Sequence, residues 1–122
     1  MEKRQTSINN SFQFAAEGII QAVKDNRNLK IHIIVAVLVL LASYYFRVTR
    51  EEFLIILVMI VLVIAAEMIN TSIEEMVDLI TTEHRLQAKA AKDVAAGMVL
   101  VVSIGAALVG LYIFIPYIQT LI

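Results

Sequence analysis

The feature that most constrains the fold is an uncharged apolar segment near the end of the chain, residues 94–115. A helix needs about 20 apolar residues to cross a bilayer, and this segment is long enough. Two shorter apolar segments, residues 33–46 and 53–66, precede it. The first is lengthened by residues 29–32, since Lys30 can extend its amine to the interface. The second continues without a break into a segment with polar residues on one face. We therefore expect one all-α integral membrane domain over residues 1–122, with membrane-spanning helices at 29–46, 53–80 and 92–115.

Composition agrees with a membrane protein and excludes several kinds of site. Hydrophobic residues make up 60% of the chain and the mean hydropathy is +0.81, whereas soluble domains are about 45–50% apolar. The chain contains no cysteine, which excludes disulfides, thiolate metal sites and a cysteine nucleophile. Its formal net charge of −1 gives no support to a nucleic-acid partner, and none is expected.

The distribution of basic residues predicts how the chain crosses the membrane. Most of the 10 lysine and arginine residues lie before the first span or between the second and third. By the positive-inside rule these two regions face the cytoplasm. We expect a multi-pass protein of the inner (plasma) membrane with a cytoplasmic N-terminus and an outer C-terminus. Ahead of the first span, residues 11–25 carry apolar residues on one helical face, which predicts an amphipathic helix on the membrane surface. The alternative is that this helix packs against neighbouring protomers.

Local signals mark two helix starts and one packing face. Asn28 is a candidate cap for the first span, and Thr49 followed by Glu52 predicts a capping box before the second. The third span carries two pairs of small residues spaced by four, Ser103 with Ala107 and Ala106 with Gly110. Such pairs let helices approach closely, so this face is predicted to pack.

A polar stripe begins where the second apolar segment ends. It consists of Glu67, Asn70, Glu74 and Asp78. Their spacing of three, four and four places them on one face of a continuing helix. Carboxylates at the edge of a membrane are costly and are candidates for function. Glu67 is placed to act as a general base on a hydroxyl at the interface, and the oxygens further along the stripe suit Mg²⁺.

This pattern fits phosphoryl transfer and is also compatible with three alternatives. Lys92 at the start of the third span is suited to neutralise phosphate charge. The chain has neither a P-loop nor a kinase glycine loop. In the first alternative, the carboxylates only solvate a protruding helix end. The second is a small oligomer that conducts protons or cations, and the third is a structural membrane subunit whose stripe binds a partner.

Four segments resemble a known family. They are residues 67–74 together with Asp78, residues 91–93, residues 14–19 and residues 27–32. The first two resemble the signature of the small prokaryotic diacylglycerol kinase family, and the last two resemble its Gram-positive undecaprenol kinase branch. The resemblance implies a homotrimer with composite active sites between protomers. It also implies ATP and Mg²⁺ on the cytoplasmic side and a lipid alcohol that enters from the bilayer.

The resemblance implies roles for individual residues. Glu67 matches the catalytic base, with Ala66 beside it on the lipid-substrate side. The positions that match nucleotide contacts are Asn70, Glu74, Glu83, His84, Lys92 and Asp93, of which Glu74 also matches a metal ligand. The family commonly has a second metal-binding carboxylate where this chain has Asn26; Asp25 or Glu17 takes its place, or the amide itself ligates. Undecaprenol is the preferred acceptor, and diacylglycerol is the alternative.

Overall fold

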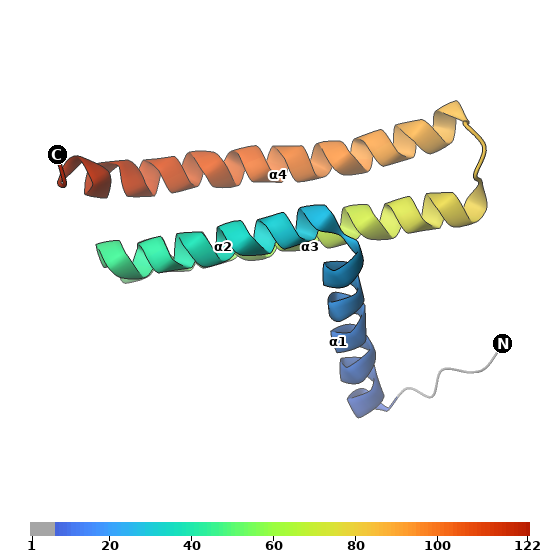
Figure 1. Cartoon of the computed structure of the whole chain (residues 1–122), viewed down its shortest axis with the longest axis horizontal. Helices are drawn as coiled ribbons and strands as arrows, with labels where there is room; N and C mark the ends of the chain where they lie inside the picture. The colour runs from blue at the N-terminus through green and yellow to red at the C-terminus, as the bar shows by residue number, and fades with distance from the viewer. Residues whose placement is uncertain (1–6) are drawn as a thin grey trace.

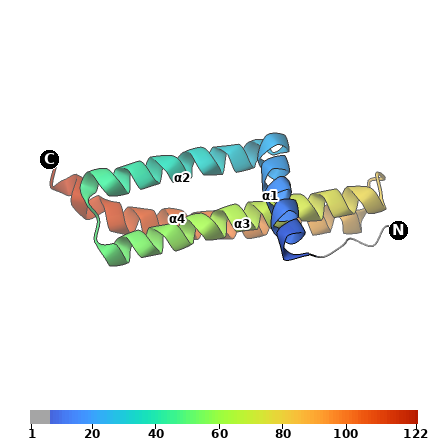
Figure 2. The same ribbon diagram turned by 90° about the horizontal axis from the view of Figure 1, so that it is seen from below.

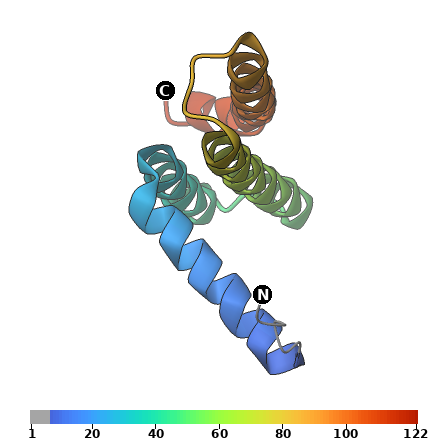
Figure 3. The same ribbon diagram turned by 90° about the vertical axis from the view of Figure 1, so that its right-hand side faces the viewer.

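The computed structural model describes residues 7–122, which form four helices. They are α1 (Ile8–Asp25), α2 (Arg27–Phe46), α3 (Arg50–Ile80) and α4 (Leu86–Gln119). Helices α2, α3 and α4 lie lengthwise beside one another, and α1 projects to one side (Figure 1; end-on in Figure 3). The α1–α2 corner and the α3–α4 link lie toward one end of this bundle, here called the polar end. The α2–α3 link and the C-terminus lie at the other, here called the far end (Figure 2).

Within the described residues, α2, α3 and α4 are long and apolar enough to cross a membrane. This confirms the expected all-α architecture with three candidate spans. The helices begin earlier than the sequence boundaries, most clearly α4, which starts at Leu86 rather than residue 92. Residues 86–91 are Leu, Gln, Ala and Lys, all good helix formers, so the helix extends through the polar region. The α3–α4 link is therefore confined to residues 81–85.

Side-chain caps define both short links between the first three helices. Thr49 Oγ1 accepts from the Glu52 amide at 3.2 Å, and Glu52 Oε2 accepts from the Thr49 amide at 2.9 Å. This confirms the predicted capping box. At the α1–α2 corner, Asn26 Oδ1 accepts from the Leu29 amide at 3.1 Å and caps α2. The prediction that Asn28 caps this helix is wrong, because α1 ends earlier and α2 restarts directly after Asn26.

The far end of the bundle is closed by aromatic side chains. The ring of Phe46 lies 6.1 Å from Phe114 and 6.0 Å from Tyr117, measured between centroids. The Tyr117 hydroxyl donates to Glu52 Oε2 at 2.5 Å, which joins the start of α3 to the end of α4. Helix α3 packs mainly against α4 and less against α2. The three helices are thus held together at the far end and leave space between them further along.

Candidate active site

The buried carboxylate of Glu67 lies beside the α1–α2 corner. Its residue is only 2% exposed. Oε1 accepts a hydrogen bond from Asn26 Nδ2 at 3.0 Å, and Oε2 lies 3.9 Å from Nε2 of His32. Burial of a carboxylate is costly unless other groups compensate. The Glu67 side chain therefore does not point into bulk solvent, and its buried carboxylate is a candidate for function.

Glu67 directly follows the uncharged apolar segment of α3, residues 53–66. Helix α3 begins at Arg50. Its first three residues are charged, so a core of about 30 Å, which takes about 20 residues at about 1.5 Å each, would extend from Phe53 to near Ser72 if α3 crosses it straight. Glu67 would then lie between one and two turns before the end of the crossing. Asn26 reaches the same level from the start of α2, since its amide contacts Glu67.

Asn70 carries an oxygen that lacks a partner within the described residues. Asn70 is 5% exposed, and its Nδ2 donates to Glu74 Oε1 at 3.2 Å. Its Oδ1 is buried and accepts no hydrogen bond. Since buried acceptors are nearly always satisfied, this oxygen fits a donor or a cation that comes from outside the chain. Carboxylate and amide oxygens are ligands that Mg²⁺ prefers, but Nδ2 of Asn70 faces Glu74, so the Asn70 amide would have to turn over for both residues to hold one cation.

The chain offers few other ligands to such a cation. Across residues 7–122, no cluster of three or more His, Cys, Asp or Glu side chains has the arrangement of a metal site. Mg²⁺ is commonly held by one or two carboxylates together with substrate phosphates and water. The donor set at Asn70 and Glu74 thus fits Mg²⁺ that arrives with a phosphorylated ligand.

Of the three residues considered for a second metal ligand, only Asn26 contacts Glu67. Glu17 is exposed and its Oε1 accepts from Gln13 at 3.0 Å. Asp25 is also exposed and accepts from Gln21. Both of these carboxylates therefore form contacts within α1, away from the α3 stripe.

A polar cleft of about 450 Å³ lies between the polar ends of α3 and α4. Four of the predicted nucleotide-contact residues line it, namely Glu83, His84, Lys92 and Asp93. Lys92 Nζ lies 2.5 Å from Asp78 Oδ1. The Lys92 ammonium on α4 thus forms an ion pair with the last carboxylate of the α3 stripe. Glu83 and Asp93 are exposed and pair with basic side chains close to them in sequence. Glu67, Asn70 and Glu74 do not line the cleft.

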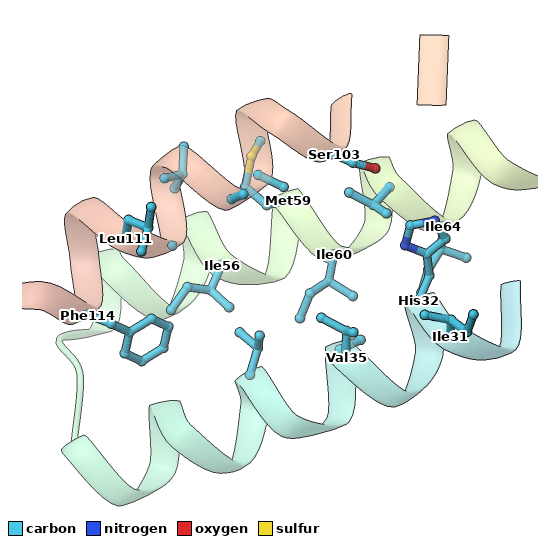
Figure 4. Close-up of a pocket in the computed structure, with 17 residues that line it drawn as sticks. Ile31, His32, Val35, Ile56, Met59, Ile60, Ile64, Ser103, Leu111 and Phe114 are labelled. Carbon is cyan, nitrogen blue, oxygen red and sulfur yellow. The ribbon is translucent and has the colours of Figure 1, made fainter. Parts of the chain in front are cut away.

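An apolar pocket of about 620 Å³ lies between α2, α3 and α4 (Figure 4). Apart from His32 and Ser103, its lining is apolar, and His32 links it to Glu67. The small residues predicted to pack closely, Ser103, Ala106, Ala107 and Gly110, line this pocket. Because these side chains are short, α4 leaves room between the helices at this point.

Two residues beside the base were not among the predicted site residues. Thr71 Oγ1 accepts from Asn26 Nδ2 and donates to the Glu67 carbonyl at 3.0 Å. A threonine within a helix does not by itself indicate a site, so its contact with Asn26 is visible only in the structure. His32 belongs to the segment 27–32, and the structure places it between Glu67 and the apolar pocket.

Comparisons with known proteins identify the family of the chain. The profile of the family described as prokaryotic diacylglycerol kinase matches residues 13–114. An undecaprenol kinase of Bacillus subtilis is 40% identical over 106 residues, which cover 87% of this chain and 86% of that protein. A diacylglycerol kinase of Synechocystis is 34% identical over 108 residues, which cover 87% of this chain and 61% of that protein.

Together the three apolar helices and these matches define the chain as a membrane lipid kinase. It belongs to the prokaryotic diacylglycerol kinase family, as the sequence resemblance indicated. Membership favours the kinase hypothesis over a conducting oligomer or a structural subunit.

Proposed function

We propose that this chain transfers the γ-phosphate of ATP to the hydroxyl of undecaprenol and releases undecaprenyl phosphate and ADP. The observation that carries the proposal is the position of Glu67, which is buried at the level where the apolar part of α3 gives way to its polar stripe. The similarity to an undecaprenol kinase over most of both chains supports the choice of acceptor.

In the proposed reaction Glu67 is the general base. The hydroxyl of the lipid gives its proton to the Glu67 carboxylate while its oxygen forms a bond to the γ-phosphorus. The bond between the γ-phosphorus and the β–γ bridging oxygen breaks, and ADP leaves with that oxygen. A positioned base contributes about 10²- to 10⁴-fold to such a rate.

The polar side of the site would hold the nucleotide. Asn70 and Glu74 are the residues that would hold Mg²⁺, which neutralises phosphate charge when bound. Lys92 is half-buried at the cleft and would exchange its contact with Asp78 for a phosphate oxygen. Glu83, His84 and Asp93 are proposed to contact the nucleotide from the same cleft.

The apolar side of the site would hold the hydrocarbon chain of the acceptor. The pocket between the spans is apolar and has His32, the neighbour of Glu67, in its lining. Ala66 precedes the base in α3 and is proposed to lie on the lipid side, although it is only 5% exposed and does not line the pocket. An acyl chain has the same chemistry as an isoprenoid chain here, so diacylglycerol is the alternative acceptor.

We further propose a homotrimer in the cell membrane, with the polar end in the cytoplasm, the C-terminus outside and α1 on the cytoplasmic membrane surface. Exposed apolar residues along α1, including Phe12, Ile19 and Ile20, support its contact with lipid. Within one chain the cleft residues and Glu67 line separate spaces. That separation supports sites completed between protomers, and mixing E67Q with K92M protomers should restore part of the activity.

The direct test supplies purified protein with labelled ATP and Mg²⁺ in mixed micelles, with undecaprenol or diacylglycerol as acceptor. We expect a kcat/KM for undecaprenol that is at least about tenfold higher, as one substrate contact worth about 1.4 kcal/mol produces. The opposite preference would make the chain a diacylglycerol kinase. ATP consumption at the same rate with and without either lipid would overturn the proposed activity.

A further inference from the structure

The side chain of Asn26 connects three helices and uses all of its polar groups to do so. Its Oδ1 caps α2 by accepting from the Leu29 amide at 3.1 Å. Its Nδ2 donates to Glu67 Oε1 at 3.0 Å and to Thr71 Oγ1, both on α3. Its own backbone amide donates to the Ala22 carbonyl at the end of α1 at 3.0 Å. Asn26 thus binds the last turn of α1, the first turn of α2 and the middle of α3.

These partners determine which way the amide points. The Leu29 amide can only donate, so it requires an oxygen opposite it. The Glu67 carboxylate can only accept when ionised, so it requires the NH₂ group. The hydroxyl of Thr71 already donates to the Glu67 carbonyl at 3.0 Å and therefore accepts from Asn26. Reversing the amide would place two oxygens against each other at Glu67 and remove the cap of α2.

We propose that Asn26 is a positioning residue for the catalytic base and not a ligand of Mg²⁺. By holding Oε1, it presents Oε2 of Glu67 to the lipid hydroxyl. The neighbour of Oε2 is Nε2 of His32 at 3.9 Å, which is too far for a hydrogen bond, so Oε2 is the oxygen that accepts the proton. This inference rests on the proposed role of Glu67.

The orientation of Asn26 explains how the chain works without a carboxylate at this position. A cation would need the amide oxygen, which is engaged with Leu29, whereas the group facing Glu67 is a donor. A carboxylate in place of Asn26 would face Glu67 with a like charge and would need a cation between them. In this proposal Asn26 orients the base, and the carboxylate of Glu74 is the main ligand left for Mg²⁺.

The substitution Asn26→Asp tests the donor that faces Glu67, because it keeps the shape and replaces the NH₂ group with an anionic oxygen. For a positioning role we expect kcat to fall by about tenfold to a hundredfold, as expected for a misplaced catalytic group, with KM for ATP within about twofold. The Mg²⁺ dependence of binding of a non-hydrolysable ATP analogue, measured by calorimetry, should not change when the amide is removed without adding a carboxylate, in Asn26→Ser. The matched control is Asn28→Asp, an exposed position in the same helical turn, which should retain wild-type kcat.

A second variant guards against a folding defect. Asn26→Ser keeps a good helix cap but shortens the side chain so that it no longer reaches Glu67. We expect it to unfold within a few degrees of wild type and to lose kcat without a change in KM. If N26D does not fold, N26S decides.

The outcomes separate this inference from the proposed function. Weaker Mg²⁺-dependent binding in N26S, or a kcat within twofold of wild type in the folded variants, would overturn the positioning role while E67Q stays inactive. Full activity of E67Q, or no lipid phosphorylation by the wild type, would overturn both proposals. An inactive E67Q together with the kcat loss at Asn26 supports both.

Discussion

The substitution Glu67→Gln tests the centre of the proposed mechanism with little disturbance of the fold. A glutamine retains an oxygen that accepts from Asn26 Nδ2, a bond of 3.0 Å in the wild type. Its amide nitrogen replaces Oε2, which lies 3.9 Å from His32 and makes no hydrogen bond there. A neutral side chain is also easier to bury than a carboxylate at a site that is 2% exposed. We expect the free energy of unfolding to change by less than about 1 kcal/mol.

The effect on turnover should be far larger, because glutamine cannot accept the proton of the lipid hydroxyl. Loss of a positioned base costs about 10²- to 10⁴-fold in kcat, equivalent to about 3–5 kcal/mol of activation free energy. The nucleotide is bound by other residues, so the affinity for an ATP analogue should stay within about twofold. The loss should therefore appear in kcat and not in KM.

The assay follows transfer of labelled phosphate from ATP to undecaprenol in mixed micelles, at saturating concentrations of both substrates. Thermal unfolding in the same detergent monitors the fold, and calorimetry measures binding of the analogue. Glu75→Gln is the matched control, since Glu75 is an exposed carboxylate on another face of α3. A Glu67→Gln enzyme that retains more than about a tenth of wild-type kcat would be inconsistent with a base at this position.

Three further substitutions probe the groups around the base. Glu74→Gln should raise the Mg²⁺ concentration needed for half-maximal binding of the ATP analogue by about tenfold, because one carboxylate is lost from a site with few ligands. An unchanged titration would show that Glu74 is a solvated surface carboxylate and not a metal ligand. Lys92→Met should raise KM for ATP by about tenfold, because one charge-assisted hydrogen bond to a phosphate oxygen is lost. An unaltered KM in steady-state kinetics would contradict a phosphate contact at Lys92. Tyr117→Phe removes the contact with Glu52 at the far end and should lower the midpoint of thermal unfolding slightly while leaving kcat unchanged; a large loss of kcat would show that the far end controls the site.

Much of the architecture follows from patterns within single segments. The three candidate spans come from apolar length, and the capping box of Thr49 and Glu52 comes from two residues three positions apart. The stripe on α3 is likewise local, since Asn70 does contact Glu74 one turn away. Such features are predictable because the geometry of a helix fixes which residues of the same helix are neighbours.

The first residue of α4 and the residue that caps α2 were harder to predict from the sequence. Residues 86–91 are polar enough to suggest a connection, yet their helix propensity continues α4 to Leu86. At the first corner, Asn26 and Asn28 are both suitable caps by composition. The choice falls on Asn26 because its amide also has partners on α3.

The sequence by itself determined the class of protein: three apolar helices, a carboxylate at the edge of one of them and the signature of a lipid kinase family. Only the tertiary structure decided that Asn26 turns its NH₂ group toward Glu67, that Lys92 meets Asp78 and that an apolar pocket opens beside His32. The reason is physical. Periodicity fixes the faces of one helix, whereas contacts between residues 41 or 14 positions apart depend on the corner and the link that set the helices beside one another.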